Sequence, residues 1–217
     1  MKNMSDNKKE IIKMIHSISG GYSVYSVFQD WVEMLAMAFS NAVDKINYEK
    51  REKRYLQLQL KYTKEQLKKM AQMTAMLVEA FEEKTEDVLG YIYMHLEISS
   101  SRLSQFFTPY HLSKLMASFS ETTTDDNGHI KIIEPSCGSG GNIIALAEHL
   151  KTNNINYQNV LFVKCKDLDW NCVYMCYVQI CLLGIPGTVE QCNTLENSYV
   201  THDKRFITPQ FLLKGGV

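Results

Sequence analysis

Proline and glycine are scarce in the first half of this 217-residue chain. All four prolines lie after residue 108, and the only glycines before that point are Gly20, Gly21 and Gly90. Proline removes a backbone N–H and glycine costs about 1 kcal/mol in a helix interior, so their scarcity permits long helices. The sequence therefore predicts a helical domain over residues 1–100 and a second domain over 101–217.

Long apolar runs are also absent. No stretch reaches the roughly 18 residues of a membrane-spanning helix, and no apolar segment follows a charged start as in a signal peptide. A composition of 45% hydrophobic and 22% charged residues is typical of a soluble, core-forming protein. We expect a cytoplasmic protein without a membrane partner.

The net charge of −1 excludes a general electrostatic attraction to nucleic acid. A local basic segment is present at residues 50–69, where only Glu52 and Glu65 are acidic. This segment is either a stripe that faces phosphates or an ordinary solvated helix face. Its basic residues are Lys50, Arg51, Lys53, Arg54, Lys61, Lys64, Lys68 and Lys69.

Cysteine pairs at metal-binding or redox spacing are missing. All six cysteines lie in the second half, and none forms a Cys-x-x-Cys pair. Cys172 and Cys176 recur at helical spacing among apolar residues, as packed side chains do. We expect reduced thiols that fill the core as small hydrophobes, and no metal site.

Hydrophobic periodicity predicts three helices in the first half. The first has capping-box spacing at Ser26 and Gln29, the second has it at Thr63 and Gln66, and the third covers about Val88 to Glu97. Their methionine-rich faces are either core or a surface for a partner; these residues are Met34, Met37, Met70, Met73 and Met76.

After residue 129 the pattern changes to short apolar runs separated by a glycine-rich turn. A strand at Ile130–Ile133 leads into Glu-Pro-Ser-Cys-Gly-Ser-Gly-Gly, and a helix is expected from about Gly141 to Leu150. Glycines let a ligand approach the backbone, and a helix start offers unpaired N–H groups. The spacing is neither that of dinucleotide enzymes nor that of a P-loop. Glu134 at the strand end suits a ligand that carries an ammonium group.

A second strand is expected at about 160–163, and it runs on to the acidic residues Asp167 and Asp169. Strand, helix and strand in this order favour a parallel sheet and an α/β fold. In Rossmann-type sheets an acid at the tip of the second strand accepts hydrogen bonds from ribose hydroxyls. Asp167 fits this role, and Asp169 is placed to cap the following helix.

The glycine turn, together with Gln105-Phe106-Phe107-Thr108-Pro109 about thirty residues before it, resembles the adenine-N6 DNA methyltransferase family. The similarity is to the modification subunits of type I restriction systems and their small mobile-element or phage relatives. It implies a helical N-terminal region followed by a partial Rossmann-like domain with parallel strands. It also implies S-adenosyl-L-methionine as the cofactor and DNA as a partner, directly or through another subunit.

The resemblance implies a role in cofactor binding for several residues of this chain. The Phe-Thr-Pro segment would fold over the cofactor, the acid before the glycine turn would meet its amino group, and the acid of the second strand would hold the ribose. The residues are Phe107, Thr108, Pro109, Glu134, Ser136, Gly138, Gly140, Asp167, Leu168 and, against the adenine ring, Asn193.

Two departures from the family stand out. Ser104 occupies a position that is usually glycine, and the catalytic Asn/Asp-Pro-Pro-Tyr/Phe motif is missing, since no two prolines are adjacent. That motif orients the amine of a flipped adenine. The nearest substitute is Thr208-Pro209-Gln210-Phe211, in which Thr208, Pro209 and Phe211 are weak catalytic candidates; alternatively, Phe211 simply packs on the sheet.

These features favour a cofactor-binding member of the family that is catalytically incomplete alone. It would act with a partner chain or as a restriction-modification-related factor, in a homodimer or in a complex with a specificity or catalytic chain. One alternative is an active DNA adenine-N6 methyltransferase with a degenerate motif at Thr208–Phe211. Another is a helical interaction module with a vestigial cofactor fold. No segment resembles a domain for recognising a DNA sequence.

Overall fold

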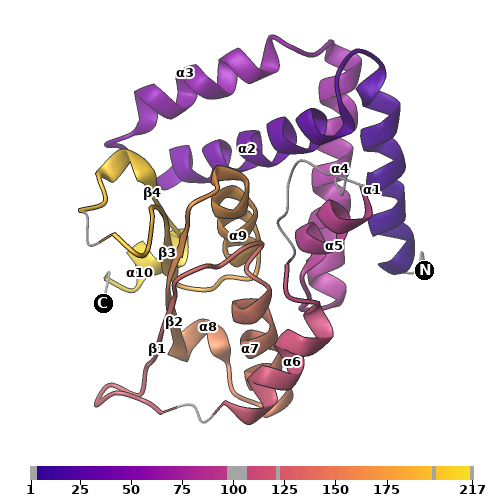
Figure 1. Cartoon of the computed structure of the whole chain (residues 1–217). Helices are drawn as coiled ribbons and strands as arrows, with labels where there is room; N and C mark the ends of the chain where they lie inside the picture. Colours follow the sequence, from indigo (N-terminus) through magenta and orange to yellow (C-terminus); the bar gives the residue numbers. More distant parts are fainter. Residues whose placement is uncertain (1–3, 97–106, 121–122, 197–198, 216–217) are drawn as a thin grey trace.

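The computed structural model describes residues 4–96, 107–120, 123–196 and 199–215 (Figure 1). Its first part, up to residue 96, consists of helices joined by short turns, as the sequence predicts. Figure 1 shows these helices along one side and across the top of the molecule. They are α1 (Met4–Ile18), η1 (Ser19–Gly21), α2 (Val24–Val43), α3 (Tyr48–Gln59), α4 (Lys64–Glu83) and α5 (Val88–His95).

The starts of α2 and α4 test the two capping predictions. In α4 the Thr63 hydroxyl accepts from the Gln66 N–H at 3.2 Å and the Gln66 side chain accepts from the Thr63 N–H at 2.9 Å, which confirms that capping box. The box at Ser26 is wrong. The helix begins three residues earlier than a Ser26 cap requires, because Ser23 accepts from the Ser26 N–H at 3.0 Å.

The second part forms a four-stranded sheet in the order β1-β2-β3-β4. The first three strands are parallel and β4 is antiparallel to β3, so the α/β class is confirmed. The strands are β1 (Ile130–Glu134), β2 (Leu161–Asp167), β3 (Gly187–Gln191) and β4 (Arg205–Ile207). The remaining helices are α6 (Tyr110–Phe119), α7 (Gly141–Thr152), α8 (Tyr157–Val160), α9 (Trp170–Leu182), η2 (His202–Lys204) and α10 (Pro209–Leu213).

Because β1, β2 and β3 are parallel, their carboxyl ends lie together at one end of the sheet and their amino ends lie together at the other. Glu134 pairs with Cys165, and Asp167 pairs with Gln191, so the carboxyl ends of β1, β2 and β3 meet. The antiparallel β4 runs the other way and ends beside Gly187, the first residue of β3. Within the part of the chain that the structure describes, no strand pairs with the outer side of β1.

One continuous hydrophobic core joins the helices of the first part to the sheet region. Trp31 of α2, Leu89 of α5 and Tyr177 of α9 are all fully or almost fully buried in it. Gln29 of α2 also donates to Asn171 of α9 at 2.7 Å. The helical layer is therefore packed directly on the sheet region, and the division at residue 100 remains a prediction.

The methionine and cysteine side chains lie mainly in this core. Met34, Met37, Met70 and Met73 are buried and Met76 is partly buried, which favours the core interpretation of the methionine-rich faces. All six cysteines are free thiols, and only Cys181 is not fully buried. In the described ranges, no helix has both the length and the apolar character needed to cross a membrane.

Candidate functional site

The glycine-rich turn between β1 and α7 depends on two glycines with left-handed backbone conformation. Gly138 has φ +53° and Gly140 has φ +96°. A Cβ on Gly138 would lie 3.1 Å from the Phe107 ring, and one on Gly140 would lie 3.2 Å from the Cys176 sulfur. Both conformation and space therefore require glycine at these positions.

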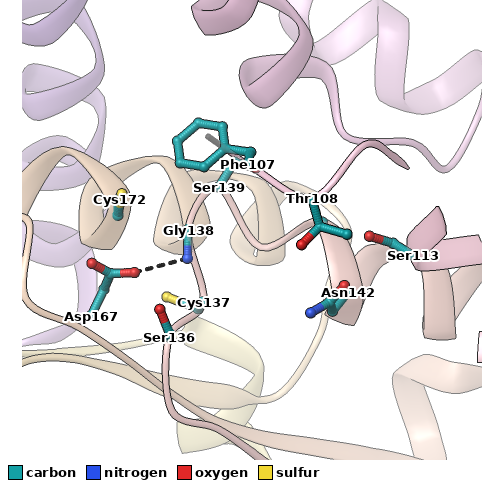
Figure 2. Close-up of a pocket in the computed structure, with 11 residues that line it drawn as sticks. Phe107, Thr108, Ser113, Ser136, Cys137, Gly138, Ser139, Asn142, Asp167 and Cys172 are labelled. Carbon is teal, nitrogen blue, oxygen red and sulfur yellow. Dashed lines mark hydrogen bonds between the residues drawn. The ribbon is translucent and has the colours of Figure 1, made fainter. Parts of the chain in front are cut away.

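Asp167, at the carboxyl end of β2, holds this turn in place. Its carboxylate accepts from the Gly138 N–H at 2.9 Å (Figure 2). It also accepts from the Asp169 N–H at 3.0 Å. An ionised carboxylate offers about four acceptor positions. The Cys172 thiol also contacts this carboxylate, and the acceptor positions that remain are available to hydroxyl groups of a ligand.

A cavity of about 290 Å³ lies at this carboxyl edge of the sheet. Figure 2 shows Phe107 on one side of the Gly138 turn and Asp167 on the other. Five residues predicted to bind the cofactor line the cavity: Phe107, Thr108, Ser136, Gly138 and Asp167. The other lining residues are Ser113, Cys137, Ser139, Gly141, Asn142 and Cys172. Burial raises the pKa of the Cys172 thiol.

Two lining residues that the sequence did not single out carry buried polar atoms without a hydrogen-bond partner. These atoms are Ser113 Oγ and Asn142 Oδ1. Ser113 is only 1% exposed. Buried polar atoms are rarely left unpaired, so each is a candidate contact for a bound ligand. Their positions in the sequence could have indicated them, because Asn142 follows the glycine turn and Ser113 lies in the first turns of the helix after Phe-Thr-Pro.

Other predicted residues surround the cavity without lining it. Glu134 accepts from the Ser136 N–H at 3.3 Å and from Asn142 Nδ2 at 3.2 Å, and it faces a neighbouring groove between β1 and α6. Gly140 shapes the turn as the N-cap of α7. Pro109 is exposed at the N-cap of α6.

Leu168 and Asn193 line a separate pocket of about 240 Å³. Asn193 is engaged locally, since it accepts from the Leu195 N–H at 3.2 Å and donates to Glu196 at 2.8 Å. The next residue, Thr194, donates to the Pro135 carbonyl at 2.5 Å, which ties this segment to the glycine turn. Ser104, Gln105 and Phe106 lie outside the described residues.

A buried polar network, also missed from sequence, joins the helical layer to the glycine turn. Asp87, the N-cap of α5, accepts from Gly90 N–H at 2.9 Å, from Ser139 Oγ at 2.6 Å and from Gln179 Nε2 at 2.8 Å. Gln179 also donates to the Ser139 carbonyl at 2.7 Å and accepts from the Leu89 N–H at 2.9 Å. Burial raises the pKa of Asp87 despite these hydrogen bonds.

The Thr208–Phe211 segment lies at the opposite edge of the sheet from the cavity. The buried Thr208 hydroxyl accepts from the N–H of Gly187, the first residue of β3, at 2.9 Å and from the Phe211 N–H at 3.3 Å. Pro209 begins α10 and Phe211 is partly buried. This structural use of the hydroxyl, away from the cavity, gives no support to a catalytic role.

The basic segment at 50–69 is not a continuous stripe of free charge. Arg51 is buried against Asp44 and Ser40, Arg54 pairs with Glu33, Lys50 pairs with Asp203, and Lys61 pairs with Asp30. These four charges are paired within the fold, which argues against a stripe of free cations; contact of the segment with phosphates stays a prediction.

The sheet, the glycine turn and the acid of β2 define an α/β protein with the fold of S-adenosylmethionine-dependent methyltransferases. The structure is similar to that of a protein from Listeria monocytogenes described as a class I S-adenosylmethionine-dependent methyltransferase, with a TM-score of 0.54 and 14% identity. The match covers 90% of this chain and 56% of that one. At this identity it shows the fold alone.

The family model for N-6 DNA Methylase matches residues 84–208, more than half of the chain, and the chain belongs to this family. A second structure, the methyltransferase subunit of a type I restriction-modification system from Streptococcus thermophilus, has a TM-score of 0.46 and 12% identity over 92% of this chain and 60% of that one. The chain thus spans less than two thirds of either protein. Curated proteins gave no match.

Proposed function

We propose that this chain binds S-adenosylmethionine in the cavity beside the glycine turn, and takes part in DNA adenine-N6 methylation together with a partner chain. The observation that carries the proposal is the contact between Asp167 and the Gly138 N–H. It places a carboxylate with free acceptor positions directly beside a turn that has no Cβ to block a ligand.

The polar groups of the cavity fit the two ends of this cofactor. Asp167 would accept from the ribose hydroxyls, which are hydrogen-bond donors. Asn142 Oδ1 and the nearby Glu134 are acceptors for an ammonium group, and the unpaired Ser113 hydroxyl can donate to a carboxylate. When bound, the cofactor supplies an activated methyl group. The residues of this chain hold and orient it.

A partner is proposed because the chain has the binding half of the fold and lacks the motif that orients an adenine amine. Holding two reactants in near-attack geometry can lower a barrier by roughly 7–11 kcal/mol. The open side of β1 supports the same proposal. Doubly wound sheets continue past their first strand, in the order 3-2-1-4, whereas among the described residues the order is β3-β2-β1 and no strand pairs beyond β1.

Calorimetry with S-adenosylmethionine tests cofactor binding. Asp167→Ala should weaken binding by about 1–3 kcal/mol, the size of hydrogen bonds to a charged group. Asp126→Ala is the matched control, because it removes the same charge from an exposed loop. Unchanged affinity in Asp167→Ala would remove Asp167 from the site, and no binding to the unaltered protein would favour the vestigial interaction module.

Methylation of plasmid DNA, followed with tritiated S-adenosylmethionine, tests the need for a partner. The purified chain alone should bind the cofactor and transfer no methyl group. Activity should appear when a chain that contains Asn/Asp-Pro-Pro-Tyr/Phe is added. Activity of the chain alone that is lost on mutation of Thr208 or Phe211 would instead establish the degenerate motif.

A further inference from the structure

A second cavity, of about 390 Å³, lies between α3 and the start of α9 and shares no lining residue with the cavity proposed for the cofactor. Three aromatic and four cationic residues line it: Trp170, Tyr174, Phe206, Lys50, Arg51, Lys53 and Arg54. It brings the basic helix α3 against aromatic residues that are more than one hundred positions away in the sequence.

The aromatic wall presents a fixed indole ring at the surface. Trp170 stacks on Tyr174, with ring centroids 5.5 Å apart, and meets the edge of Phe206 at 6.4 Å. It remains 36% exposed, whereas Trp31 is 1% exposed. A large ring that is supported on one side and open on the other can stack on a planar ligand.

Three of the four cationic residues that line the cavity pair with acidic residues. Arg54 forms two hydrogen bonds with Glu33, at 2.7 and 2.8 Å, and Lys50 pairs with Asp203 at 2.7 Å. Arg51, whose guanidinium lies 4.2 Å from the Phe206 ring centroid, is compensated by Asp44. Lys53 is exposed and has no partner in the part of the chain that the structure describes.

We propose that this cavity binds one unpaired nucleotide of a DNA strand, with its base stacked on Trp170 and its phosphate at Lys53. A single free cation matches the single charge of a phosphodiester better than the two or more charges of a free nucleotide. Stacking on an aromatic ring with a cation at the backbone is the general mode of single-strand binding. The inference deepens the proposed function, because it gives the DNA a place on this chain.

The test is fluorescence anisotropy of a labelled ten-residue oligodeoxythymidine, titrated with the full chain in the absence of S-adenosylmethionine. Trp170→Ala should weaken binding by about 5- to 150-fold, the range for loss of one stacked base. Lys53→Ala should reduce the slope of log affinity against log salt by about 0.7, as for one phosphate contact of a single strand. Quenching of Trp170 fluorescence by the oligonucleotide gives an independent signal.

Lys9→Ala is the matched control, because it removes the same charge from an exposed position on α1, outside the basic segment and the cavity. It should bind as the unaltered chain does. Circular dichroism verifies folding of Trp170→Ala, and Lys53→Ala tests the same site through a residue that is not packed in the core. Unchanged binding in both variants would overturn the proposal.

Thymidine monophosphate separates the two sources of the ligand. Weak binding of the mononucleotide that is lost in Trp170→Ala, together with tighter binding of the oligonucleotide, supports the proposal. Binding of the mononucleotide without the oligonucleotide overturns the assignment to DNA. Because no cofactor is present, failure here is distinct from failure of cofactor binding, which calorimetry measures separately.

Discussion

Truncation of Asp87 to alanine should cost about 3 kcal/mol of folding stability, because three donors lose their acceptor at once. The donors are the Gly90 N–H, the Ser139 hydroxyl and the Gln179 amide. Each buried donor that is left unpaired costs roughly 1–3 kcal/mol, and removal of the costly burial of the carboxylate offsets part of the sum. A loss of this size is a large fraction of a typical folding free energy of about 5–15 kcal/mol.

Asp87→Asn is the matched variant. An asparagine oxygen can keep the bonds from Gly90 and Gln179, and its amide can donate to the Ser139 hydroxyl, which can rotate to accept. The loss should stay below about 1 kcal/mol. In a chain of this length 1 kcal/mol corresponds to about 2–4 °C in Tm, so thermal unfolding should show a drop of about 6–12 °C for Asp87→Ala and less than about 4 °C for Asp87→Asn.

The contribution of Asp87 to folding stability changes with pH in a defined direction. Burial raises the pKa of Asp87 in the folded state, so the folded state binds the proton more strongly than the unfolded chain. The contribution of Asp87 is therefore most favourable below the unfolded pKa of about 3.9, and it declines as pH rises through the folded-state pKa. Asp87→Asn does not titrate, so its stability relative to the unaltered protein should improve over that window.

Calorimetry completes the assay, because Asp87 supports the glycine turn through Ser139. Asp87→Ala should bind S-adenosylmethionine more weakly than Asp87→Asn at a temperature where both are folded. Equal Tm values for the two variants would refute the reasoning, since they differ in the hydrogen bonds and not in the loss of the charge.

Three further predictions follow from single contacts. Gly138→Val should lower cofactor affinity at least tenfold in calorimetry, whereas Gly128→Val, which shares the positive φ but meets no atom within 4 Å, should not. Thr208→Val should lower stability by about 1–3 kcal/mol in urea unfolding and leave cofactor affinity unchanged. Burial opposes ionisation of Asp44, but hydrogen bonds from Asn47 and the charge of Arg51 lower its pKa in the folded state. The unaltered protein should therefore lose stability as pH falls through this folded-state pKa, and Asp44→Asn should lose less.

The local elements around the glycine turn could be predicted from the sequence because their signals are local. The apolar run before the turn became β1, the residues after Gly140 became α7, and the acids at 167 and 169 lie at the end of β2 and at the N-cap of α9. Five of the predicted cofactor residues line one cavity. Parallel strands explain this result, because their carboxyl ends meet.

The remaining features depend on contacts between distant residues. Asp87 and Ser139 are 52 positions apart, and nothing near Asp87 in the sequence indicates that it accepts from a residue of the turn after the first strand. The α2 start was misread because Ser23 and Ser26 both suit an N-cap, while Gln29 instead reaches Tyr25 and Asn171. The ion pairs of the basic segment could not be predicted because the acidic partners, such as Asp203, come from other elements.

The open side of β1 also matters for how this protein can be produced. An unpaired strand offers a row of N–H and C=O groups to any other extended chain, and Ile133 on this strand is 70% exposed. Lys131, paired with Asp125 at 3.0 Å, places a charge at the same edge, as gatekeeper residues do against aggregation. Co-expression with a partner that covers β1 should therefore give more soluble material than expression of this chain alone.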